Sequence, residues 1–199
     1  MDYGHYVAHA KDIDSRQWRE IKAAVVELMR NLPDHSESAG GYHRDQPLAE
    51  ALVGFDKSLL GFSIPEKVVH HDATLGDAII FNGLQTTFHG INLEGDEFCL
   101  EPDDPDNALV TQFNTHRKPY DLVVCAVLIV TDYLAPGCKA IDSKGGVDEW
   151  WPALEWVRQT LFPEAALPDS VDPERVSGPP NRPTPMELFQ SEPATSLYF

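Results

Sequence analysis

Apolar residues recur at helical spacing in two parts of the chain, and both carry the signals that begin and end a helix. The first part covers 15–32, with Asp14 as N-cap, Gln17 in the capping-box position and Pro33 as a stop. The second covers 148–162 and begins at Asp148. Each is predicted to be an amphipathic helix that lays one apolar face on a core.

Nine consecutive apolar residues, 122–130, form the longest hydrophobic run of the chain. Their β-branched content would also suit a buried strand. Pro119 fits a first helical turn, Asp121 favours the same helix end electrostatically, and Pro136 lies beyond the far end. We therefore expect a helix over about 119–134 that is apolar nearly all round and buried.

Short segments rich in β-branched and aromatic residues, separated by turn signals, account for most of the remaining pattern. Strands are predicted at 6–10, 76–83, 88–93, 97–100, 108–114 and 138–142. Residues 34–47 read as a loop, 48–53 as one helical turn, and 55–64 as an uncertain strand or pair of strands. Neighbouring strands joined by short turns imply an α+β fold with two layers, in which a mainly antiparallel sheet packs against two or three helices.

The composition changes at Pro163. Eight prolines and few aliphatic residues occur over 163–199, which predicts an extended or disordered Pro-rich tail. Residues 1–162 are therefore expected to form a single domain, and the last residues, 197–199, offer apolar side chains that could dock on a body or a partner.

Charge narrows the class of protein. The chain of 199 residues carries 32 acidic and 15 basic residues, a net charge of −17. This argues against nucleic-acid binding and against an anionic membrane surface, which both require clustered Lys and Arg. The acidic surface has three interpretations: solubility, attraction of a basic protein partner, or mimicry of nucleic-acid phosphates.

Cysteine use and hydropathy point to a cytoplasmic protein. The three cysteines, Cys99, Cys125 and Cys138, are odd in number and lack metal-ligand spacing, as in a reduced chain. Cys125 lies inside the apolar run and reads as a small core residue. The first twelve residues hold no apolar signal-peptide core, and a run of nine apolar residues is far too short to span a membrane.

The densest group of chemically capable side chains precedes the predicted buried helix, from Thr115 to Asp121. Here Arg117 and Lys118 could hold a phosphate or carboxylate at a helix N-terminus, with Thr115 and Tyr120 as further ligand-binding candidates. His116 could transfer protons and Asp121 could orient it, which makes these two the catalytic candidates. The alternative is a capped helix start whose cations offset nearby acids.

Other motifs in the sequence give weaker evidence for a functional site. The histidines His5, His9, His43, His70, His71, His89 and His116 form no HExxH motif and no paired Cys/His ligand set, so neither a metal nor another cofactor is predicted. The acidic stretch 94–106 lacks the pattern of a calcium loop and reads as a solvated hairpin tip. The chain has no G-x-S-x-G motif, and the acidic surroundings of Cys99 should raise its pKa.

Several short segments resemble a family of small uncharacterised proteins from bacteria and their phages. They are Phe81-Asn82-Gly83, Glu97-Phe98, 113–121, 142–145 and Asp148-Glu149-Trp150. The resemblance covers about 6–162, and its most specific part is the RKPYD segment at 117–121. It implies a cytosolic protein, such as an accessory protein of mobile DNA, and supports a site near Arg117. It implies no mechanism.

Together these observations favour a non-enzymatic binding or accessory protein, acting on a protein partner or on a small anionic ligand near Arg117. The alternative is a small enzyme for a phosphorylated or carboxylated molecule at the same strand-to-helix junction. A structural subunit whose tail docks into a neighbour is the third possibility.

Overall fold

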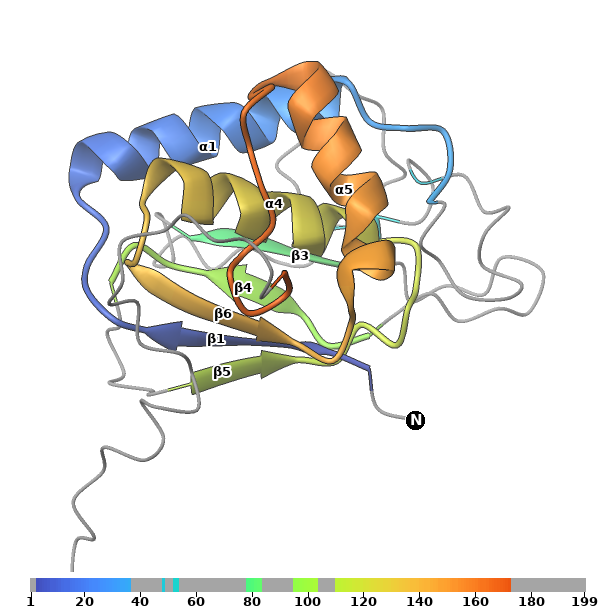
Figure 1. The fold of residues 1–199 in the computed structure, drawn as a ribbon, viewed down its shortest axis with the longest axis horizontal. Coiled ribbons are helices and arrows are strands. Elements are labelled where there is room, and N and C mark those ends of the chain that lie inside the picture. Colours follow the sequence, from blue (N-terminus) through green and yellow to red (C-terminus); the bar gives the residue numbers. More distant parts are fainter. Residues whose placement is uncertain are drawn as a thin grey trace, which may run out of the picture.

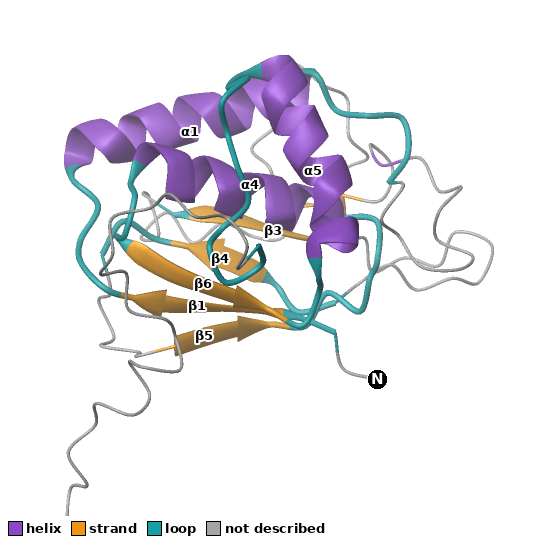
Figure 2. Ribbon diagram, viewed as in Figure 1, coloured by secondary structure: helices purple, strands orange, loops and turns teal. Residues whose placement is uncertain are grey.

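The computed structural model describes residues 3–36, 48, 52–53, 78–83, 95–103 and 110–172. Within these ranges, three helices lie on one side of two small antiparallel sheets, which confirms the predicted two-layer α+β class (Figures 1 and 2). In chain order the elements are β1 (His5–His9), α1 (Ser15–Arg30), β2 (Leu52–Val53), β3 (Ile79–Gly83), β4 (Phe98–Leu100), β5 (Val110–Phe113), α4 (Asp121–Leu134), β6 (Lys139–Ser143) and α5 (Val147–Thr160).

The first sheet has the strand order β5-β1-β6, so the first strand of the chain lies between two strands from its second half. β1 is antiparallel to both neighbours, and His5 pairs with Phe113 on one side and with Ser143 on the other. β5 and β6 therefore run in the same direction, and α4 makes the connection between them across one face of the sheet (Figure 1). Neighbouring strands of this sheet are thus far apart in sequence, whereas we had expected short turns.

The second sheet has the order β2-β3-β4, and all its pairs are antiparallel. Phe81 pairs with Phe98 across β3 and β4, with ring centroids 4.8 Å apart. Phe98 also contacts Phe113 of the first sheet at 4.9 Å. These three buried rings join the two sheets below α4.

Helix α4 forms the centre of the core. Every residue from Asp121 to Asp132 is buried, as the continuous apolar run predicts. The helix lies between the sheets and the outer helices α1 and α5 (Figure 2). Its two ends are fixed by polar contacts, of which the N-terminal ones form the candidate site.

Helix α1 is amphipathic, with a buried face of Trp18, Ile21, Ala24, Val25, Leu28 and Met29. Asp14 caps it as predicted, and its carboxylate accepts the backbone N–H groups of Arg16 and Gln17. The capping-box role of Gln17 is wrong. Its side-chain amide instead donates to the carbonyl of Leu134 at 3.1 Å, where it satisfies a backbone oxygen at the C-terminal end of α4.

Helix α5 is followed by a segment that packs on the body. Ala165, Leu167 and Val171 are buried in the same core as the helices, and Arg158 donates to the carbonyl of Ala165 at 2.8 Å. The packed region therefore reaches at least Val171, eight residues beyond the predicted start of the tail at Pro163. The remainder of the predicted tail lies outside the described residues.

Several of the predicted elements fall in parts of the chain that the structure does not describe. The segments 55–64 and 88–93, and most of 34–47, lie outside the described residues. Leu52 and Val53, predicted in a helical turn, form strand β2 and pair with β3. Among the helices described, none combines the length and apolar character needed to span a membrane.

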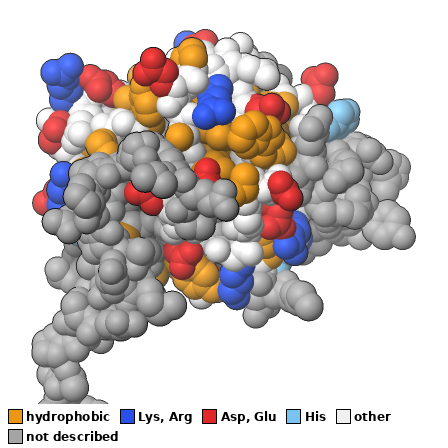
Figure 3. Space-filling model, viewed as in Figure 1, with side chains coloured by type: hydrophobic (Ala, Val, Ile, Leu, Met, Phe, Trp, Pro, Cys, Tyr) orange, Lys and Arg blue, Asp and Glu red, His pale blue; other side chains and the backbone are white. Residues whose placement is uncertain are grey.

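Acidic side chains are not segregated on the face drawn in Figure 3. Among the coloured side chains, acidic and basic groups alternate with apolar ones, and no continuous acidic stripe is visible on this face. The exposed ion pairs Arg16–Glu20 and Arg30–Glu27 of α1 also place acidic side chains beside basic ones.

Candidate functional site

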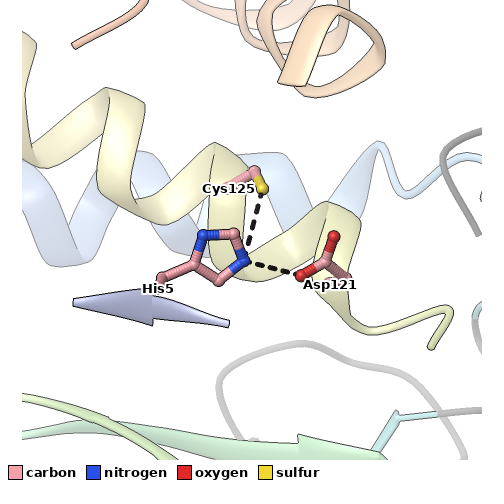
Figure 4. Close-up of side chains that lie close together, drawn as sticks. All are labelled: His5, Asp121 and Cys125. Atoms are coloured by element: carbon pink, nitrogen blue, oxygen red, sulfur yellow. Dashed lines mark hydrogen bonds and ion pairs between the residues drawn. The ribbon is translucent and has the colours of Figure 1, made fainter. Parts of the chain in front are cut away.

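Three side chains with proton-transferring or metal-ligating groups meet where α4 begins above β1 (Figure 4). Nε2 of His5 is 2.7 Å from Oδ1 of Asp121, and Sγ of Cys125 lies 3.9 Å from the same nitrogen. Asp121 and Cys125 are four residues apart on α4 and so share one helix face. All three side chains are fully or almost fully buried.

The carboxylate of Asp121 is held by two side chains and a helix end. Its Oδ1 accepts hydrogen bonds from His5 and from the hydroxyl of Thr115, which lies just before α4 and is fully buried. Asp121 is the first residue of α4, where the helix dipole favours a negative charge. A buried carboxylate at this position is thus compensated locally.

The hydroxyl of Ser143 determines the tautomer of His5. Ser143 Oγ accepts the backbone N–H of Gly145 at 2.9 Å and the indole N–H of Trp150 at 3.1 Å, which occupies both of its lone pairs. Its own hydrogen is therefore donated to Nδ1 of His5, 3.0 Å away. Because Nδ1 accepts, the proton of the neutral imidazole lies on Nε2 and is donated to Asp121.

This hydrogen-bond pattern does not fit a metal site. One atom from each of His5, Asp121 and Cys125 lies within 4.8 Å of the others, and zinc commonly binds these residue types. A metal at Nε2 would need the lone pair of that nitrogen, so the proton would have to move to Nδ1. The N–H groups of His5 Nδ1, Gly145 and Trp150 would then all point at Ser143 Oγ, which has only two lone pairs to accept them. The group is better described as a hydrogen-bonded His–Asp pair beside a thiol.

Cys125 is also poorly placed to act as a nucleophile. Complete burial, followed by the charges of Asp121 and Glu149, raises the pKa of its thiol well above the usual value. In a catalytic triad the acid and the nucleophile contact opposite ring nitrogens of the histidine. Here both face Nε2 of His5, so Asp121 already takes the proton that would leave toward the thiol.

Aromatic rings seal this buried cluster. Tyr3 and Trp150 contact His5 edge-on, with ring centroids 5.5 and 5.3 Å from that of the imidazole. The hydroxyl of Tyr3 is buried and has no hydrogen-bond partner among the described residues. Burial, followed by the charge of Asp121, raises the pKa of this phenol.

Arg117 covers the outer face of Tyr3. Its guanidinium lies 4.3 Å from the centre of the Tyr3 ring, and its Nε donates to Oε1 of Glu149 at 2.7 Å. The other carboxylate oxygen of Glu149 accepts the backbone N–H of Gly146 at the start of α5. His116 and Arg117 have φ angles of 55° and 56°, a left-handed conformation that is uncommon for residues other than glycine.

The structure separates the predicted site residues into two groups. Thr115 and Asp121 belong to the buried cluster, and Tyr120 is a core residue whose hydroxyl donates to the carbonyl of Asp96. His116 is exposed, and Arg117 and Lys118 are partly exposed on the turn above. His116 and Asp121, the two catalytic candidates, form no hydrogen bond or ion pair with each other.

Sequence reasoning missed His5 and Ser143. Residues four apart in a strand share a face of the sheet, so His5 and His9 both point to the helix side. His9 forms a second polar group at the other end of β1. It accepts from Lys139 at 2.8 Å and lies 3.0 Å from Asp12. In the sequence, the alternation of side chains between the two faces of the predicted strand was the signal that could have placed His5 and His9 on one side of the sheet.

Comparisons with protein-family models, with curated proteins and with solved structures found no match to this chain. The resemblance to the RKPYD-containing family therefore stays a prediction.

Proposed function

We propose that this chain is a cytoplasmic, non-enzymatic binding protein that holds an anionic group, a carboxylate or a phosphate, on the turn formed by His116, Arg117 and Lys118. The anion would belong to a small ligand or to a partner protein. The fixed orientation of Arg117 is the observation that carries this proposal.

Arg117 is held on two sides and open on a third. The ring of Tyr3 packs against one face of the Arg117 guanidinium, while Nε and Nη2 of Arg117 contact Glu149. Its Nη1 group has no partner among the described residues, and the side chain is 42% exposed. An arginine that is already oriented loses little conformational entropy on binding, and its free edge offers the donors that carboxylates and phosphates accept.

Burial of the other groups favours binding over catalysis. The enzymatic alternative needs His116 as acid or base and Asp121 to orient it. Asp121 is engaged by His5 and Thr115 beneath the surface, whereas His116 lies in the exposed turn. A basic protein partner is the second candidate, which the net charge of −17 favours.

A thermal-shift screen of the full chain tests the proposal. The probes are inorganic phosphate, sulfate, nucleotides, sugar phosphates and dicarboxylates, at constant ionic strength. A probe at about 100 times its Kd should stabilise the native state by about 2.7 kcal/mol, a measurable rise in Tm. The variant Arg117→Ala should lose this rise.

Arg16→Ala is the matched control, because Arg16 is also exposed and also pairs with a glutamate. It should keep the full response to the probe. If no anion stabilises the wild type, or if Arg16→Ala loses the response equally, the anion proposal is wrong. A co-precipitation that disappears at high salt would then identify a basic protein partner.

A further inference from the structure

A cleft of about 360 Å³ lies among the helices, and Arg117 is not among the described residues that line it. One of its walls is a single face of α5, because Pro152, Glu155, Trp156 and Gln159 follow the i, i+3, i+4, i+7 spacing. Leu122 of α4 and Asn31, which follows α1, also line it. The volume lies within the range of sites for small organic ligands.

The cleft has an apolar floor and a polar rim. Trp156 and Leu122 are almost fully buried, so their rings and methyl groups form the lower surface. The Trp156 indole N–H donates to the carbonyl of Asn31 at 2.9 Å, which ties α5 to the end of α1. Glu155 and Gln159 are exposed at the rim. A ligand with an apolar body and one polar end would match both surfaces.

Charge indicates the sign of that polar end. The described residues that line the cleft include Glu155 and His35 but neither lysine nor arginine. Asn31 follows the C-terminal end of α1 and Thr160 is the last residue of α5, so two helix ends with partial negative charge border the cleft (Figure 1). Leu122 lies in the first turn of α4, where the carboxylate of Asp121 offsets the partial positive charge of that helix end. The arginines in the last turns of α1 and α5 are engaged elsewhere: Arg30 pairs with Glu27, and Arg158 donates to the carbonyl of Ala165.

We propose that this cleft binds a small organic cation, an amine whose apolar body rests on Trp156 and Leu122 and whose ammonium group lies near Glu155. None of the described residues that line this site belongs to the anion site formed by His116, Arg117 and Lys118, and its charge preference is opposite.

Titration calorimetry with three phenyl-containing probes tests the sign of the charge. The probes are 4-phenylbutylamine, 4-phenylbutanol and 4-phenylbutyrate, which share the apolar body and differ at the end group. The amine should bind most tightly and the carboxylate most weakly. Tryptophan fluorescence should change with the amine, because Trp156 forms part of the floor.

Variants of the exposed rim residues Glu155 and Gln159 test whether the charge of the rim, and not only the shape of the cleft, determines amine binding. Glu155→Gln should weaken amine binding by about two- to fivefold, the range of one exposed ion pair. Gln159→Lys should weaken it as well by adding a positive charge while leaving Glu155 in place. Glu164→Gln is the control, since Glu164 is exposed and outside the lining, and it should bind as the wild type does.

All three variants change exposed side chains, so circular dichroism should show an unchanged fold. Equal binding of amine and carboxylate, amine binding that Glu155→Gln leaves unaltered, or no amine binding at millimolar concentration would each overturn the proposal. Because Arg117 takes no part in this site, Arg117→Ala should leave amine binding intact.

Discussion

The hydroxyl of Ser143 donates its hydrogen to Nδ1 of His5, since both lone pairs of that oxygen already accept hydrogens from Gly145 and Trp150. Ser143 and His5 are also directly paired in the sheet. The strand register thus decides the tautomer of a buried histidine on the neighbouring strand. Through His5, it also decides which group donates to Asp121 at the start of α4.

The tautomer can be observed directly. Nitrogen-15 NMR of the His5 ring should show a hydrogen on Nε2 and a bare Nδ1 in the native protein. In Ser143→Ala the donor to Nδ1 is lost and Trp150 loses its acceptor, so the free energy of unfolding should fall by about 1–3 kcal/mol. A native wild-type spectrum with the hydrogen on Nδ1 would show that this assignment is wrong and would reopen the case for a metal at Nε2.

Asp121 should be more important for its acceptor oxygen than for its charge alone. Asp121→Ala leaves two buried donors, on His5 and Thr115, without a partner and should cost about 3–5 kcal/mol of stability. Asp121→Asn keeps one acceptor oxygen and should cost less, about 1–3 kcal/mol. Urea denaturation of both variants measures the difference. Equal losses would mean that the charge dominates.

Tyr3→Phe should leave stability unchanged or increase it slightly. The hydroxyl of Tyr3 is buried without a hydrogen-bond partner among the described residues, so its removal abolishes a desolvation cost and breaks no hydrogen bond. Thermal and urea denaturation test this. A clear loss of stability would reveal a partner for the hydroxyl.

Gly145→Ala tests the packing around the Tyr3 hydroxyl by adding a methyl group next to it. A Cβ at this position would collide with the hydroxyl of Tyr3 and approach its ring carbons to about 3.0 Å. We expect a loss of about 1–3 kcal/mol, as for overpacking in other cores. In the Tyr3→Phe background the loss should be smaller, because the closest atom has gone. Gly146→Ala, whose Cβ would meet nothing within 4 Å, is the control.

Cys99 should make stability fall at alkaline pH. Burial, followed by the charges of Glu101 and Glu97, raises the pKa of its thiol to about 11. The unfolded chain therefore loses this proton at a lower pH than the native protein does. The contribution of Cys99 to stability is complete below the unfolded pKa of about 8.5 and declines as the pH rises toward 11.

The difference in unfolding free energy between wild type and Cys99→Ala, measured from pH 8 to 11, isolates this effect from other groups that titrate there. It should shrink with rising pH over that window. Thiol labelling provides a second readout: Cys125 and Cys138 are buried and should react only after unfolding, and Cys99 should react slowly at pH 8. A constant difference, or rapid labelling of Cys99, would contradict the prediction.

Local patterns predicted the elements well. The apolar run of α4, the cap at Asp14 and the aromatic and β-branched residues of β1 each express the short-range preferences of helix or strand, which a sequence shows directly. The arrangement of the strands was less accessible. That β1 would lie between β5 and β6 depends on pairings over more than a hundred positions, and no local signal encodes them.

The candidate site was predicted only in part for the same reason. Residues Thr115 to Asp121 are contiguous and polar, so they stood out in the sequence. Their actual partners, His5 and Glu149, lie 116 and 32 positions away. His5 was named only among the histidines that form no metal-ligand motif, although its spacing to His9 in a strand places both side chains on one face of the sheet.

The central position of β1 has a consequence for synthesis on the ribosome. A nascent chain grows from its N-terminus, so residues 5–9 emerge before both strands that flank them, which lie beyond residue 109. Until residue 143 has left the exit tunnel, this strand has neither complete pairing nor the contact between His5 and Ser143. The first sheet therefore has to assemble late, and chaperones would meet the exposed strand during that interval.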